Sequence, residues 1–275
     1  MAGGAALRRL EGVGDDREGL GRPVLPHAVH AGAVAHGDHG VSAGARQVGA
    51  EAEIFIGREP EPFGHHINLS RLVVHPDFAD AGLSSALLTY IVQIGQAIRC
   101  KRITIADGEA NAALYEHHQF SRAHTGQRIV LPAREGRVFY QASDLKTFDP
   151  AQIEGWHMPL GRYQNAREEW DRMTPGFWNS VPEIVEIETA RLHILVTGQE
   201  AYALMQQDRD DPQRVHAFVW ARRPIKGLLV MTLCDWALRH DYREIVSFAW
   251  DVTLPLLEME FKREGAPQYL YSRTV

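Results

Sequence analysis

The sequence contains only two cysteines among 275 residues, Cys100 and Cys234. Each lies in an apolar-periodic segment, so we expect two buried thiols in a reducing compartment and no disulfide. No apolar run approaches the roughly 18 residues that a membrane-spanning helix needs, and the N-terminus lacks the apolar core of a signal peptide. The expectation is therefore a cytoplasmic protein with no membrane partner.

Positive charge is also scarce, because 29 lysines and arginines stand against 35 acidic residues and give a formal net charge of -6. Nucleic-acid-binding proteins usually present a basic face, so this balance argues against a nucleic-acid partner. The length suits two modest domains or one large domain.

Aromatic residues are missing from the first 50 positions, and Phe55 is the first one in the chain. The same segment holds 11 of the 24 glycines. Such a segment buries too little apolar surface to offset its ordering entropy, so we predict that residues 1–50 are of low complexity and largely disordered. Compositional bias explains its four histidines better than a metal site, because no cysteine or regular element accompanies them, and no metal is expected. These histidines are His27, His30, His36 and His39.

From residue 51 onward, strand-like and helix-like patterns alternate. INLSRLVV (67–74) is a β-branched run, residues 83–98 carry apolar side chains at helical spacing, and RITIA (102–106) is a second strand. ANAALYEHHQF (110–120) predicts a short helix, and QRIVLPA with RVFYQAS predicts a closing pair of strands around residues 134–136. This order is typical of an α/β sheet whose first strands are joined by a right-handed crossover.

The last third of the chain repeats this order of elements. We predict a strand over 183–196, a helix over 229–240, a strand over 243–250 and a helix over 253–265, with residues 195–224 as an insertion. The predicted organisation is then an N-terminal segment (1–50), an α/β unit (51–145), a connector rich in Trp, Pro and Gly (146–182) and a second unit (183–275).

The stretch VVHPDFADAGLSSALL (73–88) places one glycine and two serines where a strand gives way to a helix. A helix N-terminus carries unpaired backbone N–H groups and a partial positive charge, which suit a phosphate. Gly82 lacks a Cβ where an anion would approach, and Ser84 and Ser85 add hydroxyl donors. An ordinary helix start explains the same residues, and both interpretations stay open.

Residues 67–120 resemble the Gcn5-related N-acetyltransferase (GNAT) family in the order and spacing of their motifs. The resemblance rests on Val74-His-Pro76, the turn Ala79-Asp-Ala-Gly82-Leu-Ser84, the helix ALLTYIVQIGQAI, the strand RITIA and the helix NAALYEHHQF. It implies an acyl-CoA N-acyltransferase-like mixed α/β sheet with flanking helices, and acetyl-CoA as the co-substrate. The repeated order of elements would place two such units in tandem.

The resemblance also implies a set of site residues. Tyr115 would protonate the leaving thiolate, although a half-buried aromatic on an amphipathic helix is an equally good reading of this tyrosine. The cofactor would contact backbone or side chains of Val73, Val74, Gly82, Leu83, Ser84, Ser85 and Asn111. A base must also deprotonate the amine, and spacing does not choose among His65, His66, Asn68 and Glu53.

Two departures concern the phosphate-binding turn. Ala79 stands where the family has Arg or Gln, and Asp80 brings a negative charge close to the expected diphosphate. These departures favour a degenerate, non-catalytic binding module, whereas the intact Gly82-Leu-Ser-Ser turn opposes it.

Residues 183–270 resemble more loosely the C-terminal half of acyl-homoserine-lactone synthases, whose fold is related. The leading prediction is an N-acetyltransferase, in which the amine of a small-molecule or peptide acceptor attacks acetyl-CoA directly. An acyl-homoserine-lactone synthase-like enzyme and a non-catalytic module of the same fold are the alternatives. The acceptor and the oligomeric state stay open, with a homodimer among the options.

Overall fold

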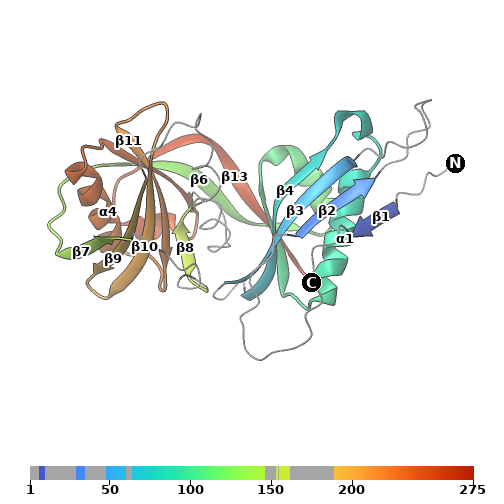
Figure 1. Ribbon diagram of the computed structural model, residues 1–275, viewed down its shortest axis with the longest axis horizontal. Coiled ribbons are helices and arrows are strands. Elements are labelled where there is room, and N and C mark those ends of the chain that lie inside the picture. Colours follow the sequence, from blue (N-terminus) through green and yellow to red (C-terminus); the bar gives the residue numbers. More distant parts are fainter. Residues whose placement is uncertain are drawn as a thin grey trace.

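The computed structural model describes residues 6–9, 29–34, 48–59, 64–145, 153, 155–161 and 189–275. The described strands form one continuous sheet in the order β1-β2-β3-β4-β5-β13-β6-β12-β11-β10-β9-β7, with β8 paired to β11. Figure 1 shows this sheet as two lobes, which the long strands β6 and β13 join.

Each lobe has its own set of elements. The first lobe contains β1 (Ala6–Arg9), β2 (Val29–Val34), β3 (Val48–Glu59), β4 (Gly64–Val74), η1 (Pro76–Phe78), α1 (Leu83–Ala97), β5 (Arg102–Asp107), η2 (Glu109–Asn111) and α2 (Ala112–His117). The second lobe contains β7 (Tyr140–Asp144), β8 (His157–Leu160), β9 (Thr189–Val196), β10 (Gln199–Gln207), β11 (Arg214–Ala221), α4 (Gly227–Arg239), β12 (Glu244–Trp250) and η5 (Leu254–Leu257). The connecting strands are β6 (Ser121–Pro132) and β13 (Lys262–Thr274).

The two connecting strands are exchanged between the lobes. The end of β13 pairs with β5, so the last strand of the chain completes the first lobe's sheet. The second half of β6 pairs with β12, so a strand from the first half of the chain completes the second lobe's sheet. Neither lobe's sheet is therefore built from one continuous stretch of sequence.

A separate apolar core lies under each helix. In the first lobe, one face of α1 buries Leu83, Leu87 and Ile91 against strands β3, β4 and β5, as the i, i+4, i+8 spacing dictates. In the second lobe, Leu229 and Leu233 of α4 lie in the corresponding core. Both cysteines are buried and free, which confirms the prediction of two unpaired thiols.

Three predictions are wrong: the pairing of two strands, one helix and the insertion. β6 and β7 are strands but do not pair with each other, because β7 pairs with β9 at the far edge of the sheet. Residues 253–265 form the short η5 and the start of β13, since Pro255 opens a 3-10 turn that ends at Glu258 with φ 53°. The supposed insertion contains β10 and β11, and β11 is the counterpart of β4 because it runs parallel to β12.

The N-terminal strands come from the glycine-rich segment. β1, β2 and the start of β3 lie within the first 50 residues, and β2 pairs antiparallel with β3. The rest of that segment lies outside the described residues, as does most of the predicted connector 146–182. The described helices are all too short or too polar to span a bilayer.

Candidate active site

Strands β4 and β5 separate part of the way along their length. Residues His66–Leu69 of β4 pair in parallel with residues Arg102–Ile105 of β5. Both strands continue beyond this paired part, β4 to Val74 and β5 to Asp107. At the same point the β3–β4 ladder jumps from the pair Glu53–Arg71 to the pair Ile54–Leu69, which leaves Ser70 as the extra residue of a bulge. A bulge bends its strand, so β4 turns away from β5 immediately after Leu69.

This divergence, here called the first splay, leaves one edge of β4 without a strand partner. Among the described residues, no strand pairs with residues 71–74 of β4 on the side that faces β5. Its backbone N–H and C=O groups can therefore pair with an extended ligand. Val73 is 39% exposed and Val74 is partly buried at the end of this edge.

The turn after β4 ends at a glycine that no other residue would replace without strain. Gly82 has φ 71° in the left-handed region, and no atom of the described residues lies within 4 Å of the position that a Cβ would take. α1 begins at the next residue, Leu83, which is buried and anchors the helix in the core. In the part of the chain that the structure describes, no side chain caps α1, so the first-turn N–H groups of Leu83, Ser84 and Ser85 form a donor set of the kind that binds anions.

The hydroxyl of Ser85 links α1 to α2. Its Oγ lies 2.7 Å from Nε2 of His118, the residue that ends α2. Burial lowers the pKa of His118, which favours the neutral ring in this contact. In the tautomer in which His118 Nε2 accepts, the Ser85 hydroxyl is engaged in this contact, and the backbone N–H of Ser85 is the group that remains for an anion.

Tyr115 and Asn111 meet at a carboxylate that the sequence did not single out. Tyr115 is buried on α2, and its hydroxyl donates to Oδ2 of Asp107 at 2.6 Å. Asn111 Nδ2 donates to the same oxygen at 2.9 Å, and the Gly108 N–H donates to Oδ1 at 2.7 Å. Burial and the Asp107 carboxylate raise the pKa of Tyr115 far above its usual range. The position of Asp107 directly after an apolar strand was the available sequence signal.

The C-terminal strand supplies part of the surroundings of Tyr115. The ring of Tyr271 on β13 lies 4.8 Å from the ring of Tyr115, centroid to centroid, and Phe120 packs at 6.3 Å. The exchanged strand β13 therefore packs directly against the ring of Tyr115.

The four candidate bases occupy different surroundings. His66 is fully buried in the paired part of β4, and burial lowers its pKa to about 4, so it stays neutral near pH 7. Asn68 is buried and accepts a hydrogen bond from Thr104, and Glu53 accepts one from Ser70 at 2.7 Å. His65 is partly buried at the start of β4.

The second lobe contains a matching divergence, the second splay, which its own chain fills. The parallel pairing of β11 with β12 is limited to Arg214–His216 of β11 and Glu244–Val246 of β12. Beyond that point β8 pairs antiparallel with β11, and Gly161 donates its N–H to the Phe248 carbonyl of β12 at 2.8 Å. β8 therefore lies between the two diverging strands.

The N-terminus of α4 is also occupied by the protein's own chain, whereas the N-terminus of α1 is open. A Cβ built on Gly227 would lie 2.6 Å from Oε2 of Glu258, so a carboxylate already stands beside this helix N-terminus. The equivalent position at Gly82 is open space.

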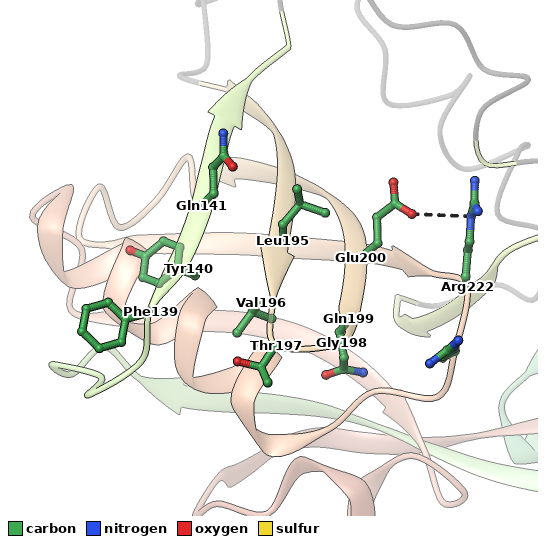
Figure 2. Close-up of a pocket in the computed structure, with 11 residues that line it drawn as sticks. Phe139, Tyr140, Gln141, Leu195, Val196, Thr197, Gly198, Gln199, Glu200 and Arg222 are labelled. Atoms are coloured by element: carbon green, nitrogen blue, oxygen red, sulfur yellow. Dashed lines mark ion pairs between the residues drawn. The ribbon is translucent and has the colours of Figure 1, made fainter.

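Two hollows lie in the second lobe, at the far end of the molecule from α1 (Figure 1). The larger, of about 720 Å³, is bounded by the edge strand β7 and the β9–β10 turn (Figure 2). Its lining carries three charged side chains: Glu200 and Arg222, which pair with each other at 3.6 Å, and Arg223.

Comparisons with known proteins agree with the sequence resemblance. Residues 46–120, which hold β4, α1, β5 and α2, match the acetyltransferase (GNAT) family. No curated protein matches the chain. The family resemblance predicted for residues 67–120 is thus confirmed.

Solved structures share the fold at low sequence identity. Eis1 from Mycobacterium abscessus is 15% identical over 97% of this chain and 72% of its own, with a TM-score of 0.57. A GCN5-related N-acetyltransferase from Anabaena variabilis is 12% identical over 82% of this chain and 60% of its own, with a TM-score of 0.54. A putative acetyltransferase from Pyrococcus horikoshii is 12% identical over 83% of this chain and 70% of its own, with a TM-score of 0.51. The chain thus has the mixed α/β fold of GNAT acyltransferases and spans 60% of the length of the Anabaena protein.

Proposed function

We propose that this protein is an acetyl-CoA-dependent N-acetyltransferase whose active site is the first splay, because residues 46–120 match the GNAT family and the described residues have the GNAT fold. The observation that carries the proposal is the conjunction of the β4 edge left without a strand partner and the left-handed Gly82 at the start of α1. An extended pantetheine arm would pair with that edge, and its diphosphate would reach the helix N-terminus.

Each part of the cofactor would meet a chemically suitable group. Backbone N–H groups of Leu83, Ser84 and Ser85 would donate to the pyrophosphate, as helix N-termini do for anions. The pantetheine amides would bond to the backbone of Val73 and Val74. Anion binding would rest on backbone dipoles, because Ala79 supplies no cation and Asp80 is an exposed carboxylate nearby.

The reaction would be direct attack of a neutral amine on the thioester carbonyl, without a covalent enzyme intermediate. Only the neutral amine has a lone pair for this attack, so a proton acceptor is required. Tyr115 would return a proton to the departing thiolate, and Asn111 would help to hold the end of β5 through Asp107. The acceptor would be a small-molecule or peptide amine, and the protein would act in the cytoplasm.

The organisation of the chain is part of the proposal. The N-terminal segment (1–50) would contribute the edge strands to the acyl-CoA-binding unit (51–145). After the connector (146–182), the second unit (183–275) would complete the sheet through β13.

Isothermal titration calorimetry with acetyl-CoA tests this function, and two matched glycines make the test specific. Gly82 and Gly198 have φ 71° and 73°, and neither has an atom within 4 Å of its Cβ position. Gly82→Trp and Gly198→Trp should therefore strain the backbone equally, at roughly 1 kcal/mol each. Because only Gly82 faces the phosphates, Gly82→Trp should weaken binding by about 100-fold or more, consistent with lost backbone donors to a charged ligand, while Gly198→Trp binds normally.

The outcomes separate the candidate functions. Absence of heat with the wild-type protein would contradict acetyl-CoA binding and would favour the non-catalytic module, which the Ala79 and Asp80 departures support. Loss of binding in Gly198→Trp alone would move the site to the hollow at the β9–β10 turn, which Gly198 lines.

A further inference from the structure

The carboxylate of Asp107 stands at a point where the chemistry of the first splay needs a proton acceptor. Asp107 ends β5, two residues beyond Ile105, where the pairing of β4 with β5 stops. Tyr115, Asn111 and Gly108 all donate hydrogen bonds to it, at 2.6 to 2.9 Å. The strongest donor, Tyr115, is the residue that the proposed function places beside the reacting sulfur.

The contact fixes the direction of the Tyr115 proton. The Tyr115 hydroxyl donates its hydrogen to Asp107 Oδ2, with 2.6 Å between the two oxygens. The lone pairs of the phenol oxygen are therefore left to accept a proton from another group. A tyrosine beside a carboxylate also resists ionisation, and the pKa of Tyr115 is raised accordingly. Tyr115 can therefore relay a proton to Asp107, but it is poorly suited to act as a tyrosinate.

We propose that Asp107 is the positioning residue and final proton acceptor behind Tyr115, so that the pair serves as the general base for the amine. This inference rests on the proposed function. The protonated amine gives one proton to Tyr115 Oη while the phenol proton moves to Asp107 Oδ2, and the neutral nitrogen then bonds to the thioester carbonyl carbon. As the C–S bond breaks, Tyr115 gives its proton to the thiolate and takes the second proton from the nitrogen, and Asp107 then releases its proton to solvent. Ammonium and acetyl thioester become amide, thiol and one proton, with no net change in the protein.

The structural role of Asp107 must be separated from this proton path. Its Oδ1 accepts the Gly108 N–H and so also shapes the turn after β5. Asp107→Asn keeps an oxygen for that bond and nearly the same volume, but an amide cannot take up the proton. Tyr115→Phe keeps the ring packed on Tyr271 and removes only the hydroxyl.

Asp251 provides a matched control in the second lobe. It directly follows β12, whereas Asp107 is the last residue of β5, and its Oδ2 accepts the Thr125 N–H at 3.0 Å. Asp251→Asn therefore makes the same chemical change at the corresponding place beside the second splay, which the chain itself fills.

Two probe nucleophiles with acetyl-CoA test the proposal. The side-chain amine of Nα-acetyl-lysine amide, called lysine amide below, is mostly protonated at pH 7.5 and must lose a proton before it can attack, whereas hydroxylamine is mostly neutral. Asp107→Asn and Tyr115→Phe should each lower kcat with lysine amide by about 100-fold, the low end of general base catalysis, and lower the hydroxylamine rate only a fewfold. Asp251→Asn should leave both rates unchanged.

Each outcome decides between supporting and rejecting the inference. Equal losses with both nucleophiles would assign Asp107 a structural role only, and unchanged rates would exclude it from the proton path. Wild-type protein that binds acetyl-CoA yet acetylates neither probe would also overturn the proton path. Failure to bind acetyl-CoA would instead overturn the proposed function.

Discussion

The two splays have the same backbone plan and different contents. In each, two parallel strands pair over three or four residues and then diverge, with a helix starting after the first strand. In the second lobe β8 fills the divergence and Glu258 stands beside the helix N-terminus. In the first lobe no described segment does either. The backbone N–H and C=O groups along a diverging strand edge need hydrogen-bond partners. The protein's own chain can supply these partners, or the edge can be left for an extended ligand.

The largest expected effect follows from removing apolar bulk at each splay. Leu160 of β8 is fully buried, so Leu160→Ala should destabilise the protein by about 2–5 kcal/mol in urea unfolding. Val73 is 39% exposed at the edge of β4, so Val73→Ala should change stability by only about 0.5 kcal/mol. Equal losses in the two variants would remove the distinction between a filled and an unfilled splay.

Ligand stoichiometry should follow the same distinction. Because β8 takes up the pairing edge of β11, we expect the full chain to bind a single acetyl-CoA in calorimetry or native mass spectrometry. Leu160→Ala should keep this stoichiometry and affinity while it loses stability. Two bound molecules per wild-type chain would mean that β8 is displaced by ligand.

The stability that each splay contributes at its paired end, where the two strands still form a ladder, should respond differently to acid. In the first lobe the ladder of β4 and β5 begins with buried His66 opposite Arg102. In the second lobe the ladder of β11 and β12 begins with Arg214 opposite Glu244, which form an ion pair at 3.0 Å. The folded pKa of His66 is about 4, below its ordinary value of 6.5, so the unfolded chain binds the proton first. This contribution is present above pH 6.5 and is lost as the pH falls towards 4.

Urea unfolding at pH 7 and pH 5 measures this acid effect. The loss from His66 by pH 5 should be about 2 kcal/mol, at ~1.4 kcal/mol per pH unit within the window. His66→Gln should remove that part of the pH dependence. A variant that loses as much stability as the wild type would assign the acid sensitivity to other groups.

The smallest expected effect concerns the unfavourable charge beside the first splay. Asp80→Asn should strengthen acetyl-CoA binding by about two- to fivefold at low salt, because it removes a carboxylate near the α1 N-terminus. The gain should shrink in 0.5 M salt, which screens exposed charges. Asp77→Asn, on the preceding 3-10 turn, is the matched control, and an equal gain there would show a non-specific charge effect.

The elements around the first splay were predictable because their signals are local. The predicted strand at 67–74, helix at 83–98 and strand at 102–106 correspond closely to β4, α1 and β5. Gly82 was identified from the sequence, and its left-handed φ supplies the physical reason for it. Asp107 was missed as a site residue, because its contacts with Tyr115 and Asn111 depend on how α2 packs beside the end of β5.

The sequence by itself determined the resemblance of residues 67–120 to the GNAT family, the position of the glycine turn before α1 and the burial of both cysteines. Hydrophobic period, glycine placement and motif spacing act within a few residues, so they can be read along the chain. Only the tertiary structure decided that β13 completes the first lobe, that Tyr271 packs on Tyr115 and that β8 fills the second splay. Strand pairing across more than a hundred residues depends on competition among many edges, and no local pattern specifies which edge a strand will join.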